Sequence, residues 1–165
     1  MKNLQPNSYQ CFVCGVDNDF GLQLKFYDTG PGEVTAEYEV PDRYQGYPGV
    51  VHGGIVAAML DEVAGRAHMG GDPPRFMYTA RLNIRYRNHV PTGVLLRMVG
   101  RIGKSRGRTA TATSVIYGPH GELLAEAEAL LVDVPSDVLE SVDLNALGWQ
   151  VYEEGERDLD ERNKT

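Results

Sequence analysis

The residues best suited to chemistry lie between His52 and Asp61, where a His-Gly-Gly triplet is followed by a carboxylate on an otherwise apolar stretch. Alanine or glycine occupies every position three or four residues from Asp61, so no cation on the same helix face can neutralise it. An isolated carboxylate in an apolar setting is costly, and desolvation raises its pKa toward the range of a general base. The alternative is a structural Asp61 that accepts hydrogen bonds from backbone amides or from a hydroxyl at a subunit contact.

Glu62, the next residue, has a partner of its own. Arg66 follows four residues later, in the orientation that favours an ion pair on a helix. We therefore expect Glu62 and Arg66 to form an ordinary exposed pair at the rim, which leaves Asp61 as the anomalous acid.

Gly53 and Gly54 follow His52 where the first free N–H groups of a helix must lie. Glycine permits close approach of a carbonyl oxygen, and the helix dipole favours negative charge there, so the triplet outlines an oxyanion hole. Gly53 and Asp61 are about 12 Å apart along a helix axis, whereas both would have to lie within about 3 Å of one reacting carbonyl. Two antiparallel copies of the helix across a twofold axis could join them, so a homodimer is expected. His52 is expected to orient the loop rather than to act as a base.

The elements that position these residues can be read from hydrophobic periodicity. Alternation of period two predicts two strands with a hairpin at residues 22–27 and 33–40, and a loop leads from there to a helix over residues 55–67. Four more strands are expected at residues 78–89, 94–102, 109–117 and 122–133, separated by turns at 91–93, 103–107 and 118–121. No βαβ rhythm is present, which indicates an α+β fold with one long helix across an antiparallel sheet of five to six strands.

Charge is distributed unevenly along this acidic chain. The formal net charge is −7, yet residues 81–108 hold eight of the sixteen Lys and Arg residues and no Asp or Glu. Such a cationic segment on an acidic protein favours a local anionic ligand over nucleic acid or an anionic membrane, which the remaining surface would repel.

Cys11 and Cys14 form a C-x-x-C pair and are the two cysteines of the chain, so no secreted disulfide framework is expected. The pair supplies half of a tetrahedral zinc site, and glycines follow it, so we expect a structured turn and no metal.

Residues 1–135 are expected to form one domain that includes this turn. Residues 136–165 are expected to form a short helix near 138–147, a docked Trp149 and a charged, mobile tail. Without a long apolar span or signal-peptide core, a cytoplasmic location is expected.

Residues 47–62, Y-P-G-V-V-H-G-G-I-V-A-A-M-L-D-E, resemble the signature of hotdog-fold acyl-CoA thioesterases of the PaaI-like branch. C-F-V-C-G-V-D-N-D-F-G-L at residues 11–22 and T-A-R-L-N-I-R-Y-R at residues 79–87 are also similar to that branch, and the likeness covers about residues 11–134. The resemblance implies a curved sheet wrapped around the central helix, a dimer or dimer of dimers, and hydrolysis of a thioester bond to coenzyme A. It implies that Asp61 is the catalytic carboxylate, Gly53 the oxyanion amide, His52 the loop histidine and Thr79 a hydroxyl that places water or the carboxylate.

Strand alternation adds a condition for Thr79, because it groups this residue with the arginines of its strand and opposite Leu82 and Ile84. Thr79 therefore reaches the helix only if the strand is kinked at its start. The phosphates of coenzyme A are a candidate ligand for the cationic segment, because arginine can form bidentate hydrogen bonds with phosphate groups. The candidate contacts are Lys104, Arg106 and Arg108 in the expected Gly-rich turn, and Arg87. Coenzyme A is part of the substrate, so no separate cofactor is expected.

The hypothesis from sequence is therefore conversion of an acyl-CoA and water to an acid and free coenzyme A. Asp61 activates a water or attacks the carbonyl, and the Gly53 N–H holds the oxyanion. Met59, Met77 and Tyr47 are the expected lining of the acyl pocket. Two alternatives stay open, an enoyl-CoA hydratase or dehydratase of the same fold and a non-catalytic acyl-CoA-binding protein. The sequence does not determine which acyl group is preferred.

Overall fold

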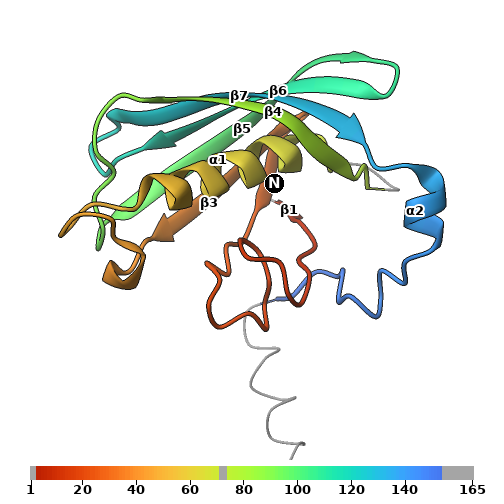
Figure 1. Ribbon diagram of the computed structural model, residues 1–165, viewed down its shortest axis with the longest axis horizontal. Coiled ribbons are helices and arrows are strands. Elements are labelled where there is room, and N and C mark those ends of the chain that lie inside the picture. The colour runs from red at the N-terminus through yellow and green to blue at the C-terminus, as the bar shows by residue number, and fades with distance from the viewer. Residues whose placement is uncertain (1–2, 71–73, 154–165) are drawn as a thin grey trace, which may run out of the picture.

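The computed structural model describes residues 3–70 and 74–153, and its main feature is an antiparallel sheet curved around one long helix (Figure 1). The helix is α1 (Gly53–Ala67). The seven strands are β1 (Asn3–Leu4), β2 (Tyr27–Gly30), β3 (Glu33–Glu39), β4 (Met77–Tyr86), β5 (Leu95–Arg106), β6 (Thr109–Tyr117) and β7 (Leu123–Asp133). Their order in the sheet is β1-β2-β3-β5-β6-β7-β4. The α+β hotdog architecture expected from the sequence is confirmed, and the short β1 brings the strand count above the five to six expected.

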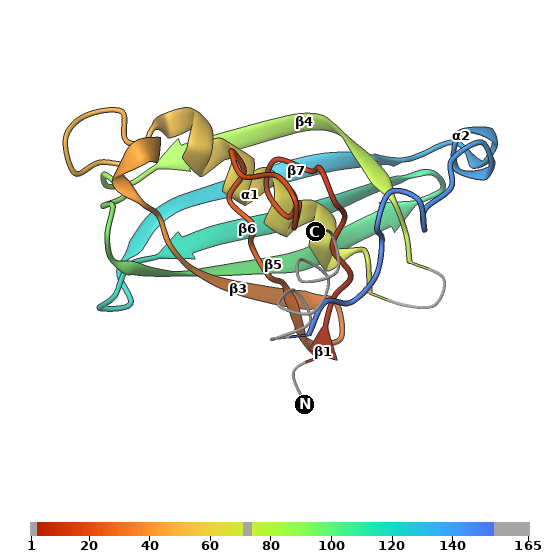
Figure 2. The ribbon, with the colours of Figure 1, turned by 90° about the horizontal axis from the view of Figure 1, so that it is seen from below.

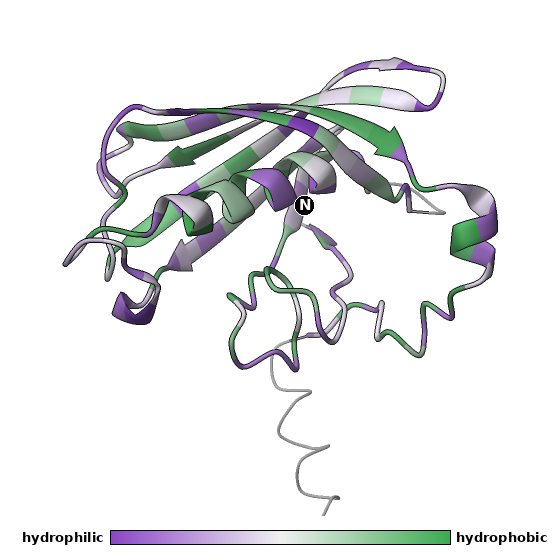
Figure 3. Ribbon diagram, viewed as in Figure 1, coloured by the Kyte–Doolittle hydropathy of each residue, from purple (hydrophilic) through white to green (hydrophobic). Residues whose placement is uncertain are grey.

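The sheet and helix pack through alternating residues, as the sequence pattern requires. Alternate side chains of β6 and of the first half of β5 are buried, among them Leu96, Met98 and Ile116, whereas the second half of β5 is exposed. Gly100 allows the closest approach, because a Cβ there would lie 2.3 Å from the Val63 carbonyl oxygen of α1. Figure 3 shows a hydrophilic band part-way along the otherwise largely apolar α1. The helix therefore carries polar groups in a position enclosed by the sheet on one side.

The helix begins with an N-cap that uses the histidine of the triplet. His52 is the N-cap residue, and its Nδ1 accepts a hydrogen bond from the Gly54 N–H at 2.9 Å. A 3-10 helix, η1 (Asp42–Tyr44), precedes it, and the backbone N–H of His52 donates to the Tyr44 carbonyl. His52 thus orients the loop that enters α1.

The N-terminal and C-terminal segments pack together on the helix side of the sheet (Figure 2). Asn7 and Gln150 form an isolated antiparallel bridge, and the Trp149 ring meets Phe76 edge-on with ring centroids 5.0 Å apart. The expected docking of Trp149 is therefore present. Within the described residues, no helix is both long and apolar enough to cross a membrane.

Three expected element boundaries were wrong. Residues 22–26 are not part of the sheet, although their alternating burial was anticipated, because Leu22 and Leu24 donate backbone hydrogen bonds to the Cys11–Cys14 region instead. The expected turn at 103–107 is mostly strand, since Gly103 packs beneath Thr111 and β5 continues to Arg106 before a tight turn at Gly107. The C-terminal helix α2 (Ser136–Glu140) is shorter than residues 138–147, and most of the expected mobile tail lies outside the described residues.

Candidate active site

Asp61 lies half-buried on α1 and accepts a hydrogen bond from the Thr79 hydroxyl, with the Oγ1 and Oδ1 atoms 2.7 Å apart. Burial raises the pKa of Asp61 above its ordinary value, the Thr79 hydrogen bond opposes this rise, and the neighbouring Glu62 charge adds to it. No ion pair involves Asp61 among the described residues. The carboxylate is therefore desolvated, oriented by one hydroxyl and available to act as a base.

A bulge in β4 allows Thr79 to reach the helix. Thr79 pairs with Leu131 and Arg81 pairs with Leu130, so Ala80 is an extra residue without its own partner on β7. The bulge reverses the alternation, and both Thr79 and Leu82 face α1 as a result. The kink that the sequence required for a Thr79 contact is present at the start of the strand.

In the ion pair formed by Glu62 and Arg66, the arginine is buried and the glutamate is partly exposed, which corrects the expectation of an exposed pair. The Arg66 side chain is 1% exposed, and its Nε lies 2.9 Å from Glu62 Oε1. Its guanidinium also donates to the Pro6 carbonyl and lies over the rings of Phe26 and Trp149. The helix pattern alone could not show this, because the covering residues come from both ends of the chain.

A hollow of about 200 Å³ opens beside Asp61. Its lining combines α1 with the segment before β4 and both terminal segments, namely Cys11, Asp61, Glu62, Gly65, Arg66, Met69, Arg75, Phe76, Met77, Thr79 and Trp149. Of the expected acyl-pocket residues, Met77 is present, whereas Met59 is fully buried and Tyr47 lies elsewhere. Sequence reasoning missed Phe76 and Arg75 here, since no periodic signal places a loop residue next to a helix.

Gly53 lies at the opposite end of α1, in a second hollow of about 540 Å³ that also contains His52, Tyr86 and Arg87. Its N–H has no acceptor among the described residues, because His52 takes the Gly54 N–H instead. The Tyr86 hydroxyl donates to the Gly53 carbonyl at 2.7 Å. A Cβ at Gly53 would come no closer than 3.6 Å to any atom outside its immediate neighbours, so packing within the chain does not require glycine. Among the described residues, the Gly53 N–H is therefore an unpaired donor on a residue that lines this hollow.

The two hollows are separate half-sites in one chain. Asp61 and Thr79 line the first, Gly53 and His52 line the second, and no residue lines both. Gly53 and Asp61 are about 12 Å apart along the axis, as the helix rise requires. One chain therefore brings Asp61 and Thr79 together but keeps both from the Gly53 amide.

The four candidate phosphate-binding cations also divide between the two ends. Arg87 lies beside Gly53 and forks onto Glu126 Oε1, at 3.1 Å from Nε and 2.5 Å from Nη2. Lys104, Arg106 and Arg108 are exposed around the β5–β6 hairpin, and the structure records no ion pair for their side chains within its described ranges. Lys104 and Arg106 were expected in a Gly-rich turn, but they lie on strand β5. Their choice as phosphate contacts therefore cannot rest on the flexibility of a loop.

The comparisons with known proteins agree with this architecture. Residues 48–125, from the loop before α1 into β7, match the family model described as the thioesterase superfamily. The chain is 26% identical over 138 residues to the acyl-coenzyme A thioesterase THEM4 of Rattus norvegicus, covering 82% of this chain and 59% of that one. A crystal structure of the thioesterase superfamily protein RHA08564 is 30% identical with a TM-score of 0.68, over 74% of this chain and 60% of that chain.

The chain is similar to proteins of the thioesterase superfamily in both sequence and fold. A third likeness, in fold alone, is to the crystal structure of smu.793 from Streptococcus mutans UA159 bound to acetyl CoA, with 20% identity and a TM-score of 0.61. It covers 67% of this chain and 88% of that one. The chain spans about three fifths of the length of these first two relatives.

Proposed function

We propose that this chain hydrolyses acyl-CoA thioesters to a carboxylic acid and free coenzyme A. The observation that carries the proposal is the half-buried Asp61, which forms no ion pair with the residues that the structure describes and accepts a hydrogen bond from the Thr79 hydroxyl at 2.7 Å. In this proposal Asp61 activates a water or attacks the thioester carbonyl, and the Gly53 N–H stabilises the oxyanion. The acyl-CoA thioesterase name of the THEM4 relative supports the activity, and the acetyl CoA of the S. mutans structure supports the ligand class.

The proposal includes a PaaI-like homodimer, with a dimer of dimers as its possible extension, because one chain separates the two half-sites. Strand β4 lies at the edge of the sheet, and Tyr78 and Tyr86 on it are 54% and 51% exposed. Antiparallel pairing of two β4 strands about the point between Leu82 and Asn83 would set Thr79 opposite Tyr86 of the partner subunit. Asp61 would then face Gly53 of the partner subunit, which gives two equivalent sites per dimer.

Free thiols at Cys11 and Cys14 fit a cytoplasmic location, which is part of the same proposal. Lys104, Arg106, Arg108 and Arg87 are proposed to contact the phosphates of coenzyme A. Replacing Lys104 and Arg106 by alanine should raise KM for an acyl-CoA and leave KM for the matching acyl-N-acetylcysteamine thioester, which has no phosphates, within about twofold. An equal rise for both substrates would remove these two residues from phosphate binding.

The experiment that tests the function is a panel of acyl-CoA esters assayed by release of free thiol, with hydration of crotonyl-CoA measured in parallel. We expect thiol release by the wild type and a loss of at least about 100-fold in kcat for Asp61→Asn, with coenzyme A binding retained. Glu128→Gln, an exposed carboxylate on the outer sheet face, is the matched control and should keep full activity.

The other results of this experiment would identify a different function. Hydration without thiol release would identify a hydratase, and binding without turnover would identify an acyl-CoA-binding protein. Activity of Asp61→Asn within about tenfold of wild type would remove Asp61 from the chemistry.

A further inference from the structure

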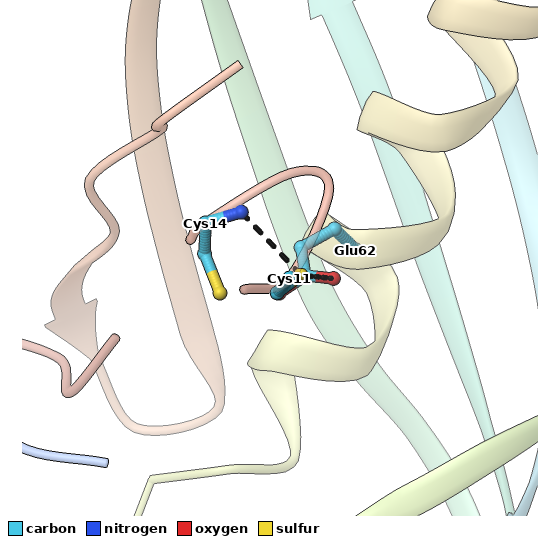
Figure 4. A group of neighbouring side chains, drawn as sticks. All are labelled: Cys11, Cys14 and Glu62. Carbon is cyan, nitrogen blue, oxygen red and sulfur yellow. Dashed lines mark hydrogen bonds between the residues drawn. The ribbon is translucent and has the colours of Figure 1, made fainter. Parts of the chain in front are cut away.

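Two thiols and a carboxylate from distant parts of the chain converge beside α1 (Figure 4). The sulfur atoms of Cys11 and Cys14 and a carboxylate oxygen of Glu62 all lie within 4.8 Å of one another. Cys11 Sγ and Glu62 Oε2 are 3.9 Å apart. The C-x-x-C pair alone is half of a tetrahedral site, and the fold adds a third ligand type to it.

Each of these three groups contacts a further polar group of the chain that helps to orient it. The Cys14 N–H points at Cys11 Sγ at 3.5 Å, and Ser8 Oγ lies 3.8 Å from Cys14 Sγ. The Arg66 Nε binds Glu62 Oε1 at 2.9 Å, which leaves Oε2 turned toward Cys11. Ligands of metal sites are held in this way by hydrogen bonds from outer groups.

The turn that carries the cysteines is fixed in place. The Gly15 N–H donates to the Cys11 carbonyl at 2.7 Å, and a Cβ on Gly15 would lie 2.3 Å from that oxygen. Cys14 is fully buried in the main core cluster, whereas Cys11 is partly exposed and lines the hollow beside Asp61. The three groups are therefore preorganised, and one side of the cluster is open.

We propose that Cys11, Cys14 and Glu62 bind a zinc ion, whose fourth position faces the hollow that contains Asp61 and is filled by water. A Zn–S bond of about 2.3 Å places tetrahedral ligand atoms about 3.8 Å apart, so the cluster has to contract by about 1 Å at most. Two thiolates, one carboxylate and the Arg66 guanidinium sum to −2, which a divalent ion neutralises. Thiolate ligands select zinc over magnesium and calcium. Binding releases the two thiol protons to solvent.

The test is zinc titration of the full-length, tag-free and reduced protein after dialysis against a chelator. We expect one zinc per chain by elemental analysis and about two protons released per zinc at a pH where both thiols are protonated before binding. We also expect a zinc-dependent rise in Tm that magnesium does not cause. Cobalt substitution should show a thiolate-to-cobalt charge-transfer band with tetrahedral visible bands, and X-ray absorption of the zinc form should show two sulfur and two lighter neighbours.

The variants separate the ligands from the fold. Cys11→Ser, which leaves one thiolate, should reduce the charge-transfer band to about half or less and weaken zinc binding. Glu62→Gln should weaken zinc binding at least about 100-fold, since it removes a direct ligand rather than an outer group. Glu62→His, which keeps a ligand atom, should restore most of the affinity. Glu126→Gln, which breaks an Arg–Glu pair on the sheet instead, is the control and should bind as wild type.

Less than about one tenth of a zinc per chain in the reduced wild type would overturn the proposal. Unchanged affinity in Cys11→Ser or in Glu62→Gln would do the same. If the two thiols form a Cys11–Cys14 disulfide on oxidation and bind no zinc when reduced, their role is in redox chemistry, and the zinc proposal is overturned as well. None of these results depends on thioesterase activity.

Discussion

Replacing Gly53 by proline deletes the proposed oxyanion donor with little cost to the helix. Gly53 is the first residue of α1, the position where proline is favoured because the N–H there has no partner within the helix. Proline also restricts the residue before it to extended backbone, and His52 already has φ −56° and ψ 135°. We therefore expect Gly53→Pro to fold with a free energy of unfolding equal to or up to about 1 kcal/mol above wild type.

The magnitude of the catalytic loss follows from the loss of one donor. Removing a single oxyanion-hole hydrogen bond costs about 2.7–4 kcal/mol, or about 100- to 1000-fold in kcat. Gly53→Ala is the matched control, since it keeps the N–H and adds a Cβ whose nearest neighbour, Tyr86 Oη, lies at 3.6 Å. Its kcat should stay within about tenfold of wild type.

The assay is kcat for thiol release at saturating acyl-CoA, with urea denaturation and sedimentation run on each variant. These two controls establish that Gly53→Pro is folded and has the same subunit state as wild type. A folded Gly53→Pro variant with kcat within tenfold of Gly53→Ala would show that this amide does not hold the oxyanion. The assignment of the oxyanion donor to the first residue of α1 would then be wrong.

Two further predictions concern Asp61 and the buried ion pair, both measured with a chelator present. Thr79→Val removes the hydrogen bond that lowers the pKa of Asp61, so the loss of kcat on acidification should begin at a higher pH than in the wild type. Thr79→Ser keeps the hydroxyl and should keep the wild-type pH profile. Identical pH profiles for the wild type and both variants would contradict this prediction. Arg66→Met leaves the partly buried Glu62 without its partner and removes the buried guanidinium from the Pro6 carbonyl and the rings of Phe26 and Trp149, so it should lower the free energy of unfolding in urea by about 3 kcal/mol. Adding Glu62→Gln should recover more than half of that loss, and a single-variant loss below about 1 kcal/mol would indicate that the pair is not desolvated.

The sequence by itself determined the elements and the identity of the unusual acid. The long helix, the four strands after it and the Asp61 position without a cation three or four residues away follow from local spacing, because helix and strand periods decide which side chains share a face. The strand over residues 22–26 and the turn over 103–107 were misjudged because the hydrogen bonds there depend on what packs alongside. Spacing along one element could not reveal those partners.

The tertiary structure alone decided what surrounds the acid. A single extra residue at Ala80 turns the Thr79 hydroxyl toward Asp61, and alternation in a regular strand would turn it away. Arg66 becomes buried because segments from both ends of the chain close over it, and the same closure brings Cys11 and Cys14 to Glu62. Asp61 and Thr79 are 18 positions apart and Cys11 and Glu62 are 51 apart, so the geometry of these contacts depends on how the chain folds back on itself rather than on the pattern of any one element.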